Sequence, residues 1–277
     1  MDLINFILNI AALLLWLGWC DKRMDALTGN PTIALARTLR PLGKIHSSRW
    51  KYLGCLAALL LLRPLFYNWI GPVVKWTPHL SLGVIAPSFL SDLYSMMALF
   101  SGLSFLLTLA NFYILLIFFS IVNNSITEVS PFQKIVQSHL GWVIRLPIAL
   151  RLVLPLLIVT IVWLGLSPLL ARWGVIPPAP VLGVRFRQGL LVGVGAYLFL
   201  QHVLAFVLLV YFLNSYIYIG EHAALRFIAQ TAQRVLRYFS WLPLRVGRMD
   251  FVPVFMIVLV YLLATILENW LPRIYPT

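Results

Sequence analysis

The sequence predicts an all-α membrane protein, a polytopic bundle of about six transmembrane helices. Hydrophobic residues make up 61% of the chain and charged residues only 10%, whereas a soluble domain carries about 25% charged residues. Long runs without Asp, Glu, Lys or Arg recur along the chain, and an apolar helix needs roughly 20 residues to cross a bilayer. The loops between these runs are short, so we expect no sizeable soluble domain.

The first two apolar runs flank the most basic loop of the chain, at 21–51. Trp19 stands near the end of the first run, 3–20, where a signal-peptide cleavage site needs a small residue, so we expect a retained span. Within the basic loop we expect a short surface helix at 33–42. The second run is 52–74.

Arg63 lies near the middle of this second run and is followed by Pro64. A charge at membrane depth is costly and points to a functional site that faces protein or water. The alternative is an arginine that snorkels from a proline-kinked helix to the headgroups. No carboxylate lies deep inside the other apolar runs, so the sequence identifies no partner.

The third run, 93–127, is too long for a simple crossing. We expect it either to tilt and project or to break near Ser101-Gly102 or Asn111. Residues 131–146 then place apolar and polar side chains on opposite sides of a helix. The fourth apolar run, 152–171, follows.

The last two runs are joined by a second amphipathic segment. After the charge-free run 188–220, apolar residues recur at helical spacing from 225 to 239, while Arg226 and Arg237 fall on the opposite side, as in a helix that lies in the headgroup region. Asp250 precedes the final run and can cap it, and Pro253 falls in its first turn. The alternative to a functional role for Asp250 is that it only caps this helix.

Three motifs of this region, LRFI at 225–228, VLR at 235–237 and DFVP at 250–253, resemble the repeat of the YggT (YlmG) membrane proteins. The resemblance covers 197–269, with departures such as Ala232 in a Thr position and Tyr238 in a Pro position. It implies a non-catalytic membrane accessory or assembly factor, because the family is associated with assembly of membrane complexes and cofactors, division and nucleoid organisation. A channel or transporter in the osmotic response, also suggested for family members, is the alternative.

The two amphipathic segments also align with each other at an offset of 92, so that Lys134 pairs with Arg226 and Arg145 with Arg237. After a six-residue insertion in the second copy, Leu152 of the first copy occupies the place of Asp250. We therefore predict a tandem two-helix repeat. The expected segments are an N-terminal two-span region at 1–92, a first YggT-like repeat at 93–171 and a second at 172–277.

The net charge of +13 is distributed unevenly between the loops. With six spans, the odd-numbered loops carry fifteen Lys or Arg and the other side five, with Arg63 left out. The positive-inside rule then places both amphipathic helices in the cytoplasm and both termini outside, as in a bacterial inner membrane protein. We expect the basic loops to meet anionic lipid headgroups rather than to bind nucleic acid. Other integral membrane proteins are the expected partners.

The sequence contains no catalytic constellation such as a Walker loop, H-E-x-x-H or G-x-S-x-G. We therefore expect neither an enzyme nor a cofactor. His202, beside Gln201 in the fifth run, is a weak candidate haem ligand, and an interhelical hydrogen bond from either residue is the favoured interpretation. A metal site formed by Cys20, Cys55 and His46 matches no compact ligand motif, so no metal is expected.

Overall fold

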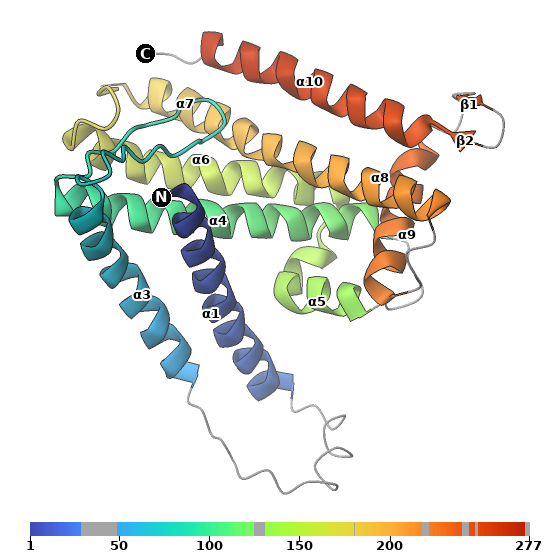
Figure 1. The fold of residues 1–277 in the computed structure, drawn as a ribbon, viewed down its shortest axis with the longest axis horizontal. Helices are drawn as coiled ribbons and strands as arrows, with labels where there is room; N and C mark the ends of the chain where they lie inside the picture. The colour runs from blue at the N-terminus through green and yellow to red at the C-terminus, as the bar shows by residue number, and fades with distance from the viewer. Residues whose placement is uncertain are drawn as a thin grey trace, which may run out of the picture. The chain divides into compact units, whose positions relative to one another are not determined.

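The computed structural model describes residues 1–28, 49–124, 131–179, 181–217, 222–239, 244–246 and 249–274, and most of them are helical (Figure 1). Six segments are long and apolar enough to cross a membrane: Asp2–Cys20, Trp50–Ile70, Tyr94–Val122, Ile148–Arg172, Leu182–Tyr216 and Val252–Ile274. The prediction of an all-α chain with about six apolar spans is thus confirmed. The surface helix expected at 33–42 lies outside the described residues.

The chain folds into two compact units. Unit 1 comprises residues 1–80 and 88–109, and unit 2 comprises residues 81–87 and 110–277. The three segments expected from the sequence depend on the tandem repeat, and that division stays a prediction.

Unit 1 contains helices α1 (Asp2–Thr28) and α3 (Arg49–Ile70), which pack against each other, and the first part of α4 (Tyr94–Val122). Their apolar contact is centred on Ala12, Leu56 and Phe105, one residue from each helix. Three helices from distant parts of the sequence therefore share one small core.

Helix α4 runs without interruption from Tyr94 to Val122, so the alternative of a break near Ser101 or Asn111 is wrong. Two hydroxyl side chains of this helix donate to carbonyls: Ser101 Oγ to Leu60 O of α3 at 3.2 Å, and Thr108 Oγ1 to Ser104 O of α4 itself at 2.9 Å. Because these hydroxyls have partners, they impose no break on the helix.

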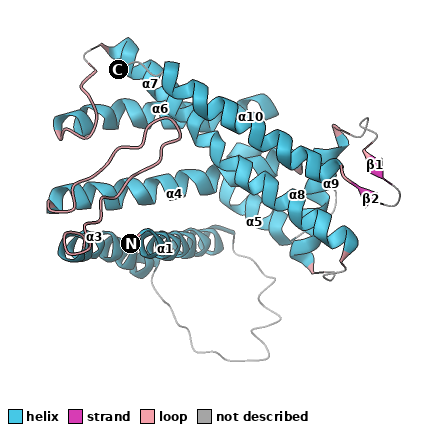
Figure 2. Ribbon diagram, turned by 45° about the horizontal axis from the view of Figure 1, so that its top comes forward, coloured by secondary structure: helices cyan, strands magenta, loops and turns pink. Residues whose placement is uncertain are grey.

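Besides the rest of α4, unit 2 contains the remaining described helices. They are α5 (Pro131–Leu140), the 3-10 turn η2 (Gly141–Arg145), α6 (Ile148–Arg172), α7 (Leu182–Gly195), the 3-10 turn η3 (Ala196–Phe199), α8 (Leu200–Tyr216), α9 (Ala223–Arg237) and α10 (Val252–Ile274). The short strands β1 (Arg245–Val246) and β2 (Met249–Asp250) pair just before α10 (Figure 2). The fifth span starts earlier than the expected run 188–220, because α7 includes Arg185 and Arg187.

Two glycines allow α6 and α7 to pack closely. A Cβ at Gly189 would lie 3.1 Å from Thr160 Cγ2, and one at Gly193 would lie 3.1 Å from Leu156 O. Their spacing is that of the G-x-x-x-G pattern, in which small residues let two membrane helices approach closely. The α6–α7 contact therefore depends on backbone proximity.

Helices α8, α9 and α10 share an apolar cluster. Leu208 of α8, Ala232 of α9 and Met256 of α10 are among its buried members. Helix α9 also contacts α5, so these two short helices lie at the same end of unit 2.

Candidate functional site

The most unusual side chain of the molecule is Arg63, which is only 2% exposed although it lies within an apolar span. Its Nη1 donates to Asn9 Oδ1 at 3.0 Å and its Nη2 to Asn5 Oδ1 at 2.5 Å. Its Nε donates to Tyr67 Oη at 3.2 Å. The guanidinium is thus held by protein, and the snorkelling interpretation is wrong.

Helical spacing assembles this group, which we call the Arg63 cluster: Asn5, Asn9, Arg63, Tyr67 and Ser104. The two asparagines are four residues apart on α1, and Arg63 and Tyr67 are four residues apart on α3, so each pair shares one helix face. Asn9 Nδ2 also donates to Ser104 Oγ of α4 at 2.7 Å. Three helices of unit 1 are joined through this one polar group.

Aromatic rings close the Arg63 cluster beside Tyr67. The Tyr67 ring centroid lies 5.3 Å from that of Trp76 and 6.0 Å from that of Phe100. Trp76 Nε1 in turn donates to Asp2 Oδ1 at 3.0 Å. The rings cover the hydrogen-bonded network and limit its access to water.

The Arg63 acceptors in the described residues are all neutral. Burying a guanidinium costs several kcal/mol even after relaxation, and hydrogen bonds must offset that cost. The cluster is therefore a fixed positive charge at membrane depth, with its hydrogen bonds directed inward. Sequence reasoning found Arg63 but not its partners, since asparagines in the first turns of a span resemble ordinary headgroup-facing residues.

On helix α9, the predicted Arg226 and Arg237 are both exposed. The buried face includes Thr231, whose Oγ1 accepts from Asn123 Nδ2 at 3.0 Å and donates to Phe227 O at 2.8 Å. A polar contact thus fastens α9 to the end of α4. The sequence analysis had assigned neither Phe227 nor Thr231 to the apolar face.

Arg151 is a second buried arginine, which the sequence analysis had counted among the charges of the loop between the third and fourth spans, whereas it lies within α6. Its Nη1 donates to Ser120 Oγ at 3.2 Å and to Asn124 Oδ1 at 3.0 Å, and its Nε donates to Leu146 O at 2.8 Å. It lies near the C-terminal end of α4, where a cation interacts favourably with the helix dipole. We infer that Arg151 joins α4 to the start of α6.

Asp250 and Pro253 occupy the start of α10 as the sequence predicts. Asp250 Oδ1 accepts from Val252 N at 3.0 Å, and Pro253 is the second residue of the helix. Tyr216 Oη accepts from Asp250 N at 2.7 Å, which joins the end of α8 to the start of α10. The carboxylate therefore acts as a helix cap within a contact between two spans.

Replacing Asp250 by alanine is expected to lower the free energy of unfolding by about 1 kcal/mol, because the Val252 N–H loses its acceptor. Asp250→Asn, which keeps a side-chain oxygen, should cost only a few tenths of that amount. Thermal unfolding of the purified protein in detergent would measure both. Equal losses in the two variants would show that the cap is not the role of this residue.

A polar strip runs along α8 and α10 within their spans: Gln201, His202, Tyr261, Thr265 and Glu268. Gln201 Nε2 donates to Glu268 Oε1 at 3.1 Å, so the predicted interhelical hydrogen bond is confirmed. The His202 and Tyr261 rings are 6.0 Å apart. Most of the strip, Gln201 apart, is exposed on the surface of the unit.

Glu268 is the carboxylate that sequence reasoning missed. It lies six residues before the end of α10, or about 9 Å along the helix axis. The sequence analysis assigned Glu268 to the end of the chain and therefore did not recognise that it lies within the last apolar span.

No three His, Cys, Asp or Glu side chains of the described residues gather in a group that could hold a metal ion. Cys20 and Cys55 form no disulfide with each other, and Cys55 is exposed. His46, the third residue of the conceivable site, lies outside the described part of the chain. His202, the candidate haem ligand of the sequence analysis, is exposed on α8.

The six spans and the buried polar contacts between them are typical of polytopic helical membrane proteins. No protein-family model, curated protein or solved structure matches the chain.

Proposed function

We propose that this protein is a non-catalytic integral membrane accessory or assembly factor, which acts through protein contacts in the membrane and at its cytoplasmic face. The observation that carries the proposal is the polar strip of Gln201, His202, Tyr261, Thr265 and Glu268. Polar and ionisable side chains at membrane depth almost always face protein or a water-filled cavity. Because most of these side chains are exposed on the surface of unit 2, we expect a partner helix to cover them.

The chemistry of the strip indicates what that partner carries. The Glu268 carboxylate accepts one hydrogen bond from Gln201 and has capacity for more. The His202 and Tyr261 side chains add groups that can donate or accept. We therefore expect a transmembrane partner helix with a basic or hydrogen-bond-donating residue opposite Glu268.

The arrangement of α5 and α9 supports the placement of the two amphipathic segments on the same side of the membrane. The helices contact each other, and Asn123 at the end of α4 bonds to Thr231 of α9. The C-terminal ends of α4 and α8 thus lie at one end of unit 2. Together with the basic loops, this favours a cytoplasmic docking face, a bacterial inner membrane location and termini outside the cytoplasm.

Two matching contacts support the tandem YggT-like repeat. Asn124 after α4 bonds to Arg151 of α6, and Tyr216 at the end of α8 bonds to Asp250 before α10. The offset of 92 relates Asn124 to Tyr216. In each proposed copy, the end of the first span is thereby bonded to the start of the second.

The channel or transporter alternative has less support. A conducting path needs polar groups that face a pore, whereas the Arg63 cluster directs its groups toward one another. A fixed positive charge at that depth also opposes the passage of cations. Flux of a cation through purified protein in liposomes would contradict the proposal.

Site-specific photo-crosslinking would test the partner contact. A photoreactive residue at Thr265 should give one protein adduct of discrete size, with the crosslink mapped to a transmembrane helix that carries a basic or donor residue. The same probe at Leu262, an exposed apolar residue of α10, should label lipid. Lipid adducts alone at both positions would contradict a protein partner on this strip.

A further inference from the structure

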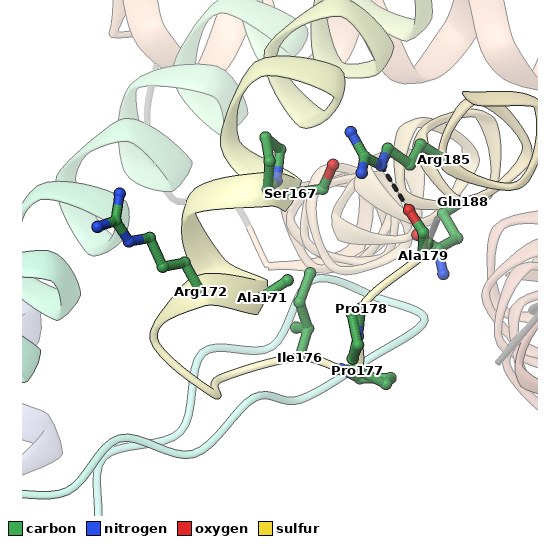
Figure 3. Close-up of a pocket in the computed structure, with 10 residues that line it drawn as sticks. Ser167, Ala171, Arg172, Ile176, Pro177, Pro178, Ala179, Arg185 and Gln188 are labelled. Carbon is green, nitrogen blue, oxygen red and sulfur yellow. Dashed lines mark hydrogen bonds between the residues drawn. The ribbon is translucent and has the colours of Figure 1, made fainter. Parts of the chain in front are cut away.

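A pocket of about 290 Å³ opens between the end of α6, the start of α7 and the loop that joins them (Figure 3). Prolines and small apolar side chains form much of its wall. The polar lining consists of Ser167, Arg172, Arg185 and Gln188. Neither the Arg63 cluster nor the polar strip contributes to it.

The Ser167 hydroxyl gives the first indication of a ligand. The side chain is 3% exposed, and its Oγ has no hydrogen-bond partner among the described residues. Buried hydroxyls nearly always have such a partner. In Figure 3 the hydroxyl points toward the Arg185 guanidinium, on the pocket side of α6.

Arg185 supplies the charge. Its Nε donates to Ala179 O at 2.6 Å, which holds the guanidinium in place. Its two Nη groups make no hydrogen bond with the described residues and remain available as a fork of donors, the geometry that matches a phosphate. The Arg172 guanidinium points away from the pocket in Figure 3 and adds charge only at the rim.

The backbone and the local sequence also favour an anion. The carbonyl end of α6 is closed by its own turn, in which Val175 N donates to Leu170 O at 2.9 Å and Gly174 adopts a φ of 70°. The N-terminal end of α7, which attracts negative charge, has no side-chain cap. No Asp or Glu occurs between residues 167 and 188.

We propose that this pocket binds a phosphate group, with Arg185 as its charged donor and Ser167 as a second donor. The pocket lies where two spans end, at the level of lipid headgroups, and its volume is near the lower limit of known small-ligand sites. It suits one phosphate-bearing headgroup or a small soluble phosphate, which share this chemistry.

Calorimetric titration of the full-length protein in a maltoside detergent would test the site with two probes, a short-chain phosphatidylglycerol and inorganic phosphate. Saturable binding of the lipid alone would assign a headgroup site, and binding of both would assign a general phosphate site. Either result supports the proposal. Failure of both probes to bind would overturn it.

Variants separate this pocket from general attraction to a basic surface. Arg185→Gln and Ser167→Ala should each weaken binding, roughly 10-fold or more for the arginine, since a charge-assisted hydrogen bond is lost. Arg187→Gln removes the same charge two residues away, outside the pocket, and should leave affinity unchanged. Equal weakening by Arg185→Gln and Arg187→Gln would contradict the assignment. Ser167→Ala keeps the test decisive if Arg185→Gln does not fold.

Discussion

Replacing Asn9 by leucine is expected to lower the free energy of unfolding of unit 1 by about 3 kcal/mol. The change removes the acceptor of Arg63 Nη1 and the donor to Ser104 Oγ, while it leaves the guanidinium buried. The buried charge keeps its bonds to Asn5 and Tyr67 but bears the same desolvation cost with less compensation. Denaturant titration in mixed micelles, followed by tryptophan fluorescence, would measure the loss.

A double variant gives the sharper test of the Arg63 cluster. When Arg63→Leu is combined with Asn9→Leu, the under-compensated charge disappears together with one of its acceptors, so the double variant should be more stable than Asn9→Leu alone. Asn269→Leu, on the exposed side of α10, is the matched control and should change little. If the losses of unfolding free energy measured for Arg63→Leu and for Asn9→Leu simply add in the double variant, the proposed pairing of Arg63 with Asn9 is wrong.

Replacing Gly193 by leucine is expected to separate α6 from α7 and to cost about 3 kcal/mol, the upper end for overpacked positions. An added Cβ would lie 3.1 Å from the backbone oxygen of Leu156, which cannot turn aside as a flexible side chain can. The backbones of the two helices must therefore move apart. The yield of folded protein and its thermal midpoint in detergent would report the effect.

Gly165→Leu is the control for this prediction. Gly165 lies on the exposed side of α6, and a Cβ there would meet no atom within 4 Å. Its replacement should be neutral or slightly stabilising, because glycine weakens a helix interior. A Gly193→Leu protein as stable as Gly165→Leu would show that close approach at Gly193 does not hold the hairpin together.

The sequence could predict the six apolar helices because hydropathy is a local property of each run. It also predicted the cap at Asp250, since capping depends on residues adjacent in the chain. The alternative of a break in α4 arose because Ser101-Gly102 and Asn111 were interpreted as weak points, whereas a helical hydroxyl such as that of Ser101 can bond to a carbonyl of a neighbouring helix.

The sites were harder to predict than the helices because their partners are distant in the sequence. Arg63 obtains its acceptors from α1, and Thr231 obtains its donor from α4. Only packing brings these residues together. The pocket at Ser167 and Arg185 was missed for the same reason, since neither residue belongs to a local motif.

Labelling of single cysteines with a membrane-impermeant maleimide would test the topology on which the account rests. Gln137 of α5, Gln233 of α9 and Val181 before α7 are exposed positions suited to the cysteine, in a background with Cys20 and Cys55 replaced by serine. The account predicts that Gln137 and Gln233 are labelled from the same side of the membrane and Val181 from the other. Labelling of Gln137 and Gln233 from opposite sides would contradict it.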